Sequence, residues 1–304
     1  MIREAPGGVN HGDREGAMGG ARGRGAAGRP FAPAGRSRRR ALGQHFLVDP
    51  GVAEAIVAAV GASSDDLVCE IGAGEGALTG LLQQRAGRVV ALEIDADLHA
   101  RLARRWPNVD LRQADARRFR YETLRAERPG PAGRVLVVGN LPYSVSKPIL
   151  ARLLEARGAL DAAVLMLQRE VAERLVAPPG GKTYGALSVF WQTWADPALL
   201  FRVPPTAFRP PPAVDSAVVR VTFRRSPRIP LADERAFLRV VKAAFAQRRK
   251  TLLNALRAAG PGLGGAGATA ALAAAGVEGR RRAETLTLEE LARLAQFFSV
   301  REGA

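Results

Sequence analysis

Short, uninterrupted apolar runs alternate with amphipathic stretches through the first half of the chain. Runs begin at Leu67, Val89 and Arg134, and a weaker one covers residues 109–112. Continuous apolar runs of this length are typical of strands buried on both faces. A helix is expected over about 50–60, with Pro50 near its first turn, and another after the run at Leu67. This alternation predicts an α/β fold with an open sheet.

A longer amphipathic pattern covers residues 233–258 and predicts a single helix. Apolar side chains repeat at three- to four-residue spacing on one face, and basic side chains gather on the opposite face. The basic set is Arg235, Arg239, Lys242, Arg249, Lys250 and Arg257. Such a stripe is either a solvated face or a phosphate-binding surface. Arg248 falls on the apolar side near Phe237, so we expect it to form a salt bridge at a domain junction or to reach a nucleic acid.

The charge distribution bears on this choice. The net charge is +16. Residues 1–40 contain 9 Arg and 3 acidic residues, residues 41–203 contain 19 basic and 18 acidic residues, and residues 204–304 contain 17 basic and 8 acidic residues. The excess therefore lies at the two ends of the chain. This asymmetry indicates a polyanionic partner, most simply nucleic acid, held outside the region of strands.

The tetrad Asn140-Leu141-Pro142-Tyr143 follows the apolar run at 134–139. Polar groups at the carboxyl end of a buried strand lie where open α/β sheets bind ligands. The Asn140 amide oxygen and the Leu141 carbonyl can accept both hydrogens of an exocyclic amine, Pro142 fixes its own φ, and Tyr143 offers a face for a flipped base. This set suits methyl transfer to an adenine amino group without a general base. The alternative is an ordinary strand-to-turn junction with a buried tyrosine.

A glycine-rich turn follows the strand that begins at Leu67. Its glycines, Gly72, Gly74 and Gly76, do not have the G-x-G-x-x-G spacing of a pyrophosphate-binding turn. Glu70 just before the turn favours a cationic ligand, such as a sulfonium or an amino-acid ammonium. Glu93 ends the next strand, where a carboxylate accepts from ribose hydroxyls, and Asp115 is placed to bind an adenine edge. In this order they indicate S-adenosylmethionine rather than NAD.

The remaining composition excludes several classes. Three His and one Cys cannot build a recurring Cys/His metal site, and no apolar run approaches the ~20 residues that span a bilayer. Residues 1–40 contain ten Gly and few large apolar residues, which predicts a disordered tail. The tail is either an RNA-tethering arm or an idle extension, and Met18 is a possible alternative start. We expect a cytoplasmic protein without a metal and, by default, a monomer.

Over residues 40–300 the chain resembles the bacterial small-subunit ribosomal RNA adenine N6,N6-dimethyltransferases. The similar stretches are 43–47, 70–79, 93–95, 140–143, 167–175, 184–188, 203–210, 214–219 and 244–252. The resemblance implies a Rossmann-like methyltransferase domain with a mostly parallel sheet, followed by a small helical domain. We therefore expect a tail at 1–40, a catalytic domain at 41–223 and an RNA-binding domain at 224–304. Three positions depart from the family pattern, namely His45, Ala73 and Lys147.

The resemblance also implies the site and the substrate. The cofactor-binding residues are expected to be Gln44, His45, Leu47, Gly72, Gly74, Glu93, Asp115 and Asn140, with Asn140 shared with the target base. The RNA-binding residues are expected to be Phe208, Arg209, Arg248, Arg249 and Lys250. Phe208 either stacks on the base opposite Tyr143 or packs in the core. The expected substrate is a pair of adjacent adenosines near the 3′ end of 16S rRNA. The alternatives are a 23S rRNA adenine methyltransferase of the macrolide-resistance type and a non-catalytic ribosome-assembly factor with this fold.

Overall fold

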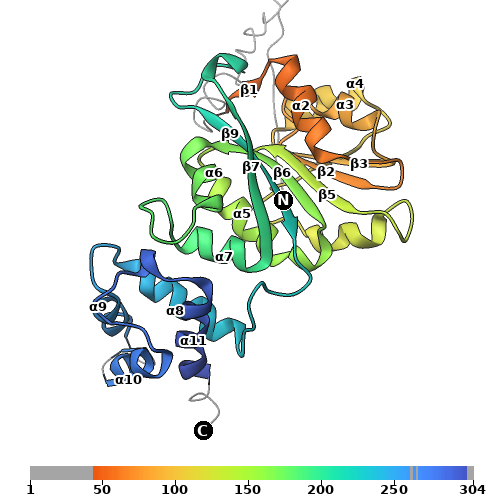
Figure 1. The fold of residues 1–304 in the computed structure, drawn as a ribbon. Helices are drawn as coiled ribbons and strands as arrows, with labels where there is room; N and C mark the ends of the chain where they lie inside the picture. Colours follow the sequence, from red (N-terminus) through yellow and green to blue (C-terminus); the bar gives the residue numbers. More distant parts are fainter. Residues whose placement is uncertain (1–43, 261–262, 265, 300–304) are drawn as a thin grey trace, which may run out of the picture.

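The computed structural model describes residues 44–260, 263–264 and 266–299 (Figure 1). The tail predicted at 1–40 lies outside the described residues. A seven-stranded sheet forms the centre, with its strands in the order β4-β3-β2-β5-β6-β9-β7. The strands are β2 (Leu67–Ile71), β3 (Arg88–Glu93), β4 (Asp110–Gln113), β5 (Val135–Asn140), β6 (Ala162–Gln168), β7 (Ala195–Val203) and β9 (Ser216–Phe223).

The sheet is mostly parallel, as predicted. Strands β2 to β6 pair with one another in parallel, whereas β9 runs antiparallel to both of its neighbours, β6 and β7. The four strands predicted from the apolar runs are confirmed as β2, β3, β4 and β5. The strand order runs outward from β2 in both directions, which creates a topological switch point between β2 and β5.

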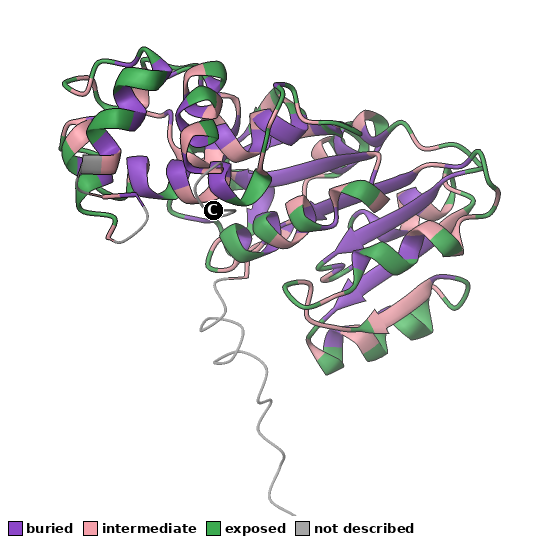
Figure 2. Cartoon of the chain, turned by 90° about the horizontal axis from the view of Figure 1, so that it is seen from below, coloured by how far each residue is buried: buried purple, intermediate pink, exposed green. Residues whose placement is uncertain are grey.

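Helices cover both faces of the sheet, so the inner strands β2, β3, β5, β6 and β9 are mostly buried, whereas the edge strands β4 and β7 are more exposed (Figure 2). One face packs against η1 (Tyr121–Glu127), α5 (Ser146–Glu155), α6 (Arg169–Val176) and α7 (Ala186–Trp194). The other packs against α2 (Pro50–Val60), α3 (Thr79–Gln83) and α4 (Ala96–Arg105). The predicted helix over 50–60 is confirmed as α2, and Asp49 caps it by accepting from the Val52 backbone N–H at 3.1 Å. A short 3-10 turn, η2 (Arg157–Ala159), follows α5.

A group of helices follows β9. They are α8 (Glu234–Ala246), α9 (Leu252–Arg257), α10 (Ala266–Ala275), η4 (Ala283–Thr285) and α11 (Leu288–Ser299). Their common hydrophobic cluster also includes Tyr184, Val189 and Trp194 from the preceding segment. The helical region therefore shares part of its core with the sheet region, and the domain division at 223/224 remains a proposal. Within the described residues, no helix has the length and apolar character needed to cross a bilayer.

The prediction of one continuous helix over 233–258 is wrong. The helix breaks after Ala246 because Gln247 leaves helical geometry (φ −127°, ψ 72°). A second helix starts at Leu252, where the Thr251 side chain caps it by accepting from the Asn254 backbone N–H. Arg248, Arg249 and Lys250 consequently lie in a turn, and their positions on a helical wheel have no meaning.

A two-stranded sheet pairs a segment before the first central strand, β2, with a segment just before β9. Strand β1 (Phe46–Leu47) pairs antiparallel with β8 (Phe208–Arg209), which follows the 3-10 turn η3 (Pro205–Ala207). The Val48 backbone N–H donates to the Ala207 carbonyl at 2.9 Å. These contacts hold the 44–47 segment against the carboxyl ends of the central strands.

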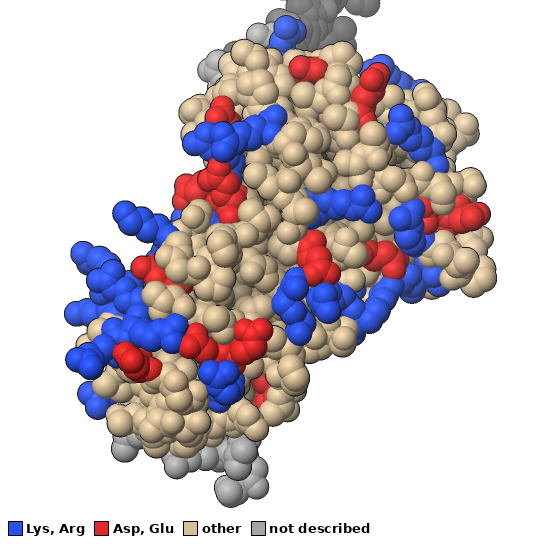
Figure 3. Space-filling view, in the orientation of Figure 1, with Lys and Arg blue, Asp and Glu red and all other residues tan. Residues whose placement is uncertain are grey.

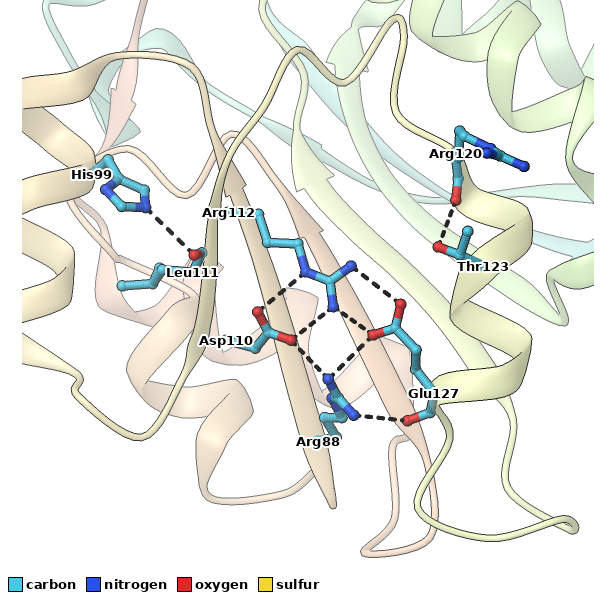
Figure 4. Close-up of polar contacts among 8 residues, drawn as sticks. All are labelled: Arg88, His99, Asp110, Leu111, Arg112, Arg120, Thr123 and Glu127. Atoms are coloured by element: carbon cyan, nitrogen blue, oxygen red, sulfur yellow. Dashed lines mark hydrogen bonds and ion pairs between the residues drawn. The ribbon is translucent and has the colours of Figure 1, made fainter.

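An ion network anchors the edge strand β4 (Figure 4). The Arg112 guanidinium donates to Asp110 at 2.8 Å and to both carboxylate oxygens of Glu127 on η1. Arg88 on β3 donates to the same two carboxylates, at 2.8 Å and 3.2 Å. Because each arginine is shared between two acids, β4 is fixed to β3 and η1, and so is the start of the loop that carries Asp115.

Candidate active site

An open cavity lies at the carboxyl ends of β2, β3, β4 and β5, at the switch point of the sheet. Its wall brings together the following predicted residues: Gln44, His45, Gly72, Gly74, Glu93, Asp115, Asn140, Leu141, Pro142 and Tyr143. These residues come from five separate parts of the chain. Four of these parts converge because parallel strands place their carboxyl ends together at one sheet edge. Gln44 and His45 reach the same edge through the pairing of β1 with β8.

The glycine-rich turn wraps around the end of β3. Its three glycines, Gly72, Gly74 and Gly76, all have positive φ, at 67°, 58° and 83°. The Gly72 backbone N–H donates to the Leu92 carbonyl at 2.8 Å, and the Gly74 backbone N–H donates to Glu93 Oε2 at 2.8 Å. The turn backbone therefore lines the cavity, and its hydrogen bonds to Leu92 and Glu93 fix its position relative to β3.

Glu93 is buried at the end of β3 and lines the cavity. Its two carboxylate oxygens each accept one backbone N–H, Oε2 from Gly74 and Oε1 from Asp95 at 2.9 Å. A carboxylate has about four acceptor sites, so each oxygen retains capacity for one further donor. Glu93 is thus held in place by the backbone and can still accept two hydroxyl groups from a ligand.

Glu70 does not line the cavity, and its proposed contact with a cationic ligand is wrong. Successive side chains of a strand point to opposite faces: Cys69 and Ile71 face η1 and α5, whereas Val68 belongs to the cluster around α2 and α3. Glu70 shares the side of Val68, is 2% exposed, and accepts from the Thr79 hydroxyl on α3 at 2.6 Å. It therefore connects the strand before the turn to the helix after it.

Burial raises the pKa of Glu70 from an ordinary 4.5 to about 8, against the Thr79 hydrogen bond, with the Glu93 charge adding to the rise. Between these two values the folded state holds a proton that the unfolded state has released, so we expect stability to fall as pH rises through this window. Glu70→Gln keeps an acceptor for Thr79 and removes the titration. The wild-type free energy of unfolding should lose up to about 1.4 kcal/mol per pH unit relative to the variant.

Urea unfolding of both proteins at pH 5.5, 6.5 and 7.5 checks this, because all other titrating groups are common to the pair. Parallel curves for the two proteins would show that Glu70 does not titrate in this range.

Asn140 ends β5 with a fixed amide orientation. Its Nδ2 donates to the His45 carbonyl at 2.9 Å, which leaves Oδ1 as the side-chain acceptor at the cavity wall. The next residue, Leu141, has a fully buried side chain, so only its backbone can face a ligand. The β1 segment therefore determines which end of the Asn140 amide is available.

Tyr143 is half-buried and is held at both ends. Its hydroxyl forms a 2.5 Å hydrogen bond with the Ser216 hydroxyl at the start of β9, and its ring lies 5.5 Å from the His45 ring at an interplanar angle of 35°. Burial raises the pKa of Tyr143, which the Ser216 hydrogen bond partly opposes. The His45 ring is in turn fixed by a 2.7 Å contact between Nδ1 and the Pro210 carbonyl. Neither Ser216 nor Pro210 was a predicted site residue.

Leu47, Phe208 and Arg209 lie beside the cavity but outside its lining. Leu47 pairs with Phe208 in the β1–β8 sheet, and Phe208 is 3% exposed within the cluster that covers α2. This placement favours the core-packing alternative for Phe208 over stacking on a base. Arg209 is exposed. Leu47 and Phe208 therefore pack in the core beside the cavity, and Arg209 pairs through its backbone with Phe46, which lines the cavity.

The remaining predicted residues lie in the helical region. Arg248 donates to the Lys182 carbonyl and pairs with Glu284 at 3.5 Å, which agrees with the expected salt bridge at the junction of the two regions. Arg249 and Lys250 are exposed. The Leu252 backbone N–H donates to the Arg281 carbonyl at 2.7 Å, so the segment 279–282, with its exposed Arg280 and Arg282, lies beside this turn. Sequence reasoning missed that pairing, since it joins segments about 30 residues apart.

This fold and this cavity define the class of Rossmann-like methyltransferases. A crystal structure of the 23S rRNA methyltransferase ErmE superposes with a TM-score of 0.61 and 26% identity, covering 84% of this chain and 99% of that one. A dimethyladenosine transferase from Plasmodium falciparum shares the fold, with a TM-score of 0.67 and 23% identity over 85% of this chain and 98% of that one.

The chain belongs to the ribosomal RNA adenine dimethylase family, whose model matches residues 35–299. It is 44% identical over 272 residues to the ribosomal RNA small subunit methyltransferase A of Pelotomaculum thermopropionicum, which covers 87% of this chain and 92% of that relative. The resemblance inferred from the sequence motifs is therefore confirmed.

Proposed function

We propose that this enzyme transfers methyl groups from S-adenosylmethionine to N6 of two adjacent adenosines near the 3′ end of 16S rRNA, during biogenesis of the small subunit. The observation that carries the proposal is the Asn140–Tyr143 tetrad, whose amide orientation is fixed in the same cavity as the glycine-rich turn and Glu93. The 44% identical small-subunit relative supports the choice of substrate.

The donor groups around the cavity fit S-adenosylmethionine. Glu93 has free acceptor capacity for two ribose hydroxyls, and Asp115, near the start of the loop after β4, lines the same cavity. The Gln44 Oε1 atom is buried at the cavity wall and has no hydrogen-bond partner among the described residues. A buried acceptor without a partner is costly, and an ammonium or hydroxyl of the cofactor would satisfy it. When bound, the cofactor supplies the methyl group on its sulfonium.

The tetrad would hold the target base by hydrogen bonds and stacking. Asn140 Oδ1 accepts one hydrogen of the adenine amino group and the Leu141 carbonyl accepts the other, which makes the nitrogen more nucleophilic. The Tyr143 ring, fixed by Ser216, stacks on the flipped base. Most of the rate enhancement then comes from positioning and preorganised hydrogen bonds, and water takes the proton that the methylated amine releases.

Methyl incorporation from labelled S-adenosylmethionine tests substrate and chemistry together. Unmethylated small subunits and unmethylated large-subunit RNA are compared, and the modified nucleoside is identified. Dimethyladenosine in the small subunit alone is the expected result. Label in large-subunit RNA would place the protein with the macrolide-resistance enzymes, and no label in either, with cofactor still bound, would leave the assembly-factor alternative.

The proposed RNA contact lies on the helical region. Lys and Arg side chains gather there on the face shown in Figure 3, over the part that contains α8 and α9. Arg249, Lys250, Arg280 and Arg282 are exposed on two adjacent segments, and none of the four forms an ion pair with another described residue. Cations without a protein partner are available to phosphates, and their contacts release counterions.

Arg249→Gln with Lys250→Gln should weaken RNA binding and reduce the slope of log K against log salt by about 1.4 to 1.8, since two phosphate contacts are lost. Filter binding over a salt series measures this. Arg101→Gln with Arg104→Gln, on the exposed face of α4, removes the same charge elsewhere and should change the slope little. Equal slopes for the two double variants would show that net charge alone matters.

The same proposal places the enzyme in the cytoplasm, where small subunits assemble, and takes a single chain as the acting unit. Light scattering of the purified protein tests the second point, and a mass of two chains would contradict it.

A further inference from the structure

One carboxylate in the cavity wall, Asp115, is already paired with a neighbouring arginine. Asp115 Oδ1 accepts from the Arg117 backbone N–H at 2.9 Å and from Arg117 Nε at 2.9 Å. Asp115 Oδ2 accepts from Arg117 Nε at 3.0 Å and from Nη2 at 2.6 Å. Both residues line the cavity. A carboxylate has about four acceptor sites. Three N–H groups of Arg117, with Nε–H shared between the two oxygens, occupy most of the capacity that a ligand amino group would need.

Asp115 and Arg117 form an ion pair that is partly exposed, so Arg117 can leave Asp115 for solvent. Hydrogen bonds from Arg117 hold the pKa of Asp115 below its ordinary value, against a smaller effect of burial. The Arg117 side chain is 45% exposed and the Asp115 side chain 22% exposed. Arg112, three residues before Asp115, differs because it is shared between Asp110 and Glu127 and is fixed on both sides (Figure 4). Arg117 has only one carboxylate partner among the described residues, and its guanidinium is free to move into solvent.

We propose that Arg117 acts as a latch, meaning that it occupies Asp115 at the adenine end of the cofactor site until the cofactor displaces it. In this way Arg117 sets the affinity for the cofactor. This inference rests on the proposed function, in which Asp115 accepts from the adenine amino group. The amino group must displace one arm of the guanidinium before it can bond to Asp115. Arg117 is therefore a positioning residue that acts through Asp115. It lowers the affinity for the cofactor because it occupies Asp115 before the cofactor binds, and it does not bind the ligand itself.

Two consequences follow from the exposure of the pair. An exposed ion pair is worth little in water, so removing it should tighten cofactor binding by about two- to fivefold. Salt screens such a pair, so the affinity of the wild type for a ligand of zero net charge should rise with ionic strength. S-adenosylhomocysteine, which is zwitterionic at neutral pH, is the appropriate probe.

Calorimetric titration with S-adenosylhomocysteine at low and high salt tests the latch. Arg117→Met should bind about two- to fivefold more tightly than wild type at low salt and lose the rise with salt. Arg118→Met is the matched control, because it removes the same charge from the next exposed residue and should behave as wild type. In an Asp115→Asn background, Arg117→Met should have no effect.

Weaker binding by Arg117→Met would overturn the latch and make Arg117 a ligand contact. Equal effects of Arg117→Met and Arg118→Met would overturn it in favour of a general charge effect. Failure of the wild type itself to bind S-adenosylhomocysteine would instead contradict the proposed function, so the two failures are distinguishable.

Discussion

Asn140→Ala is expected to lower the rate of methyl transfer by at least about 100-fold, the loss typical of removing one preorganised hydrogen-bonding group from an active site. The substitution removes the Oδ1 acceptor at the cavity wall and the Nδ2 donation to the His45 carbonyl, so the amine loses an acceptor and the 44–47 segment loses an anchor. RNA affinity should stay within about twofold, because the proposed phosphate contacts lie on the helical region.

Single-turnover methylation at saturating cofactor, together with filter binding of RNA, separates chemistry from binding. The matched control is Gln113→Ala, which removes an exposed amide at the end of β4 that lies outside the cavity lining. It should retain wild-type turnover. Wild-type turnover in Asn140→Ala would remove the tetrad from its assigned role.

Gly76→Ala should destabilise the protein by about 2 to 5 kcal/mol. Gly76 has φ +83°, and a Cβ there would lie 2.1 Å from the Trp106 ring. The left-handed conformation costs about 1–2 kcal/mol for an L-residue, and overpacking costs about 1–3 kcal/mol more. The Trp106 ring cannot easily withdraw, because it also lies against Gly80 and carries the Arg105 guanidinium 4.5 Å from its centroid.

Gly61→Ala separates the two costs. Gly61 has φ +61°, but nothing lies within 4 Å of an added Cβ, so only the conformational cost applies. Urea unfolding midpoints should therefore fall further for Gly76→Ala than for Gly61→Ala. When each is measured against Trp106→Ala in a Trp106→Ala background, the two glycine substitutions should lower the midpoint equally. A loss that is equal for both glycine variants would rule out the clash.

The features that sequence predicts well here are local ones. Strands β2, β3 and β5 each contain a short continuous apolar run, and the turn glycines mark backbone that other residues adopt only with strain. Once these strands are parallel, Glu93, Asp115 and Asn140 must meet at one edge. The side that a single strand residue faces is less predictable: Glu70 lies one residue from Ile71 in the cavity wall and yet points to α3.

Features that depend on distant contacts were not predictable in this way. The pairing of β1 with β8 joins residues far apart in the chain, and neither two-residue strand has a periodic pattern of its own. At the break after Ala246, Thr251 caps the next helix and Arg248 contacts Lys182 and Glu284, and the amphipathic pattern indicates none of these contacts. The Arg117 pairing required the actual geometry of the loop after β4.

The β1–β8 pairing also orders events during synthesis of the chain. The glycine-rich turn, the tetrad and strands β2 to β5 all precede residue 144. The Pro210 carbonyl, which contacts the His45 ring, lies 165 residues after His45. Domains generally fold as units during translation, so the cavity is complete only when the chain through Pro210 is available to fold. The enzyme would thus become competent to bind its cofactor only after residue 210 has left the ribosome that makes it.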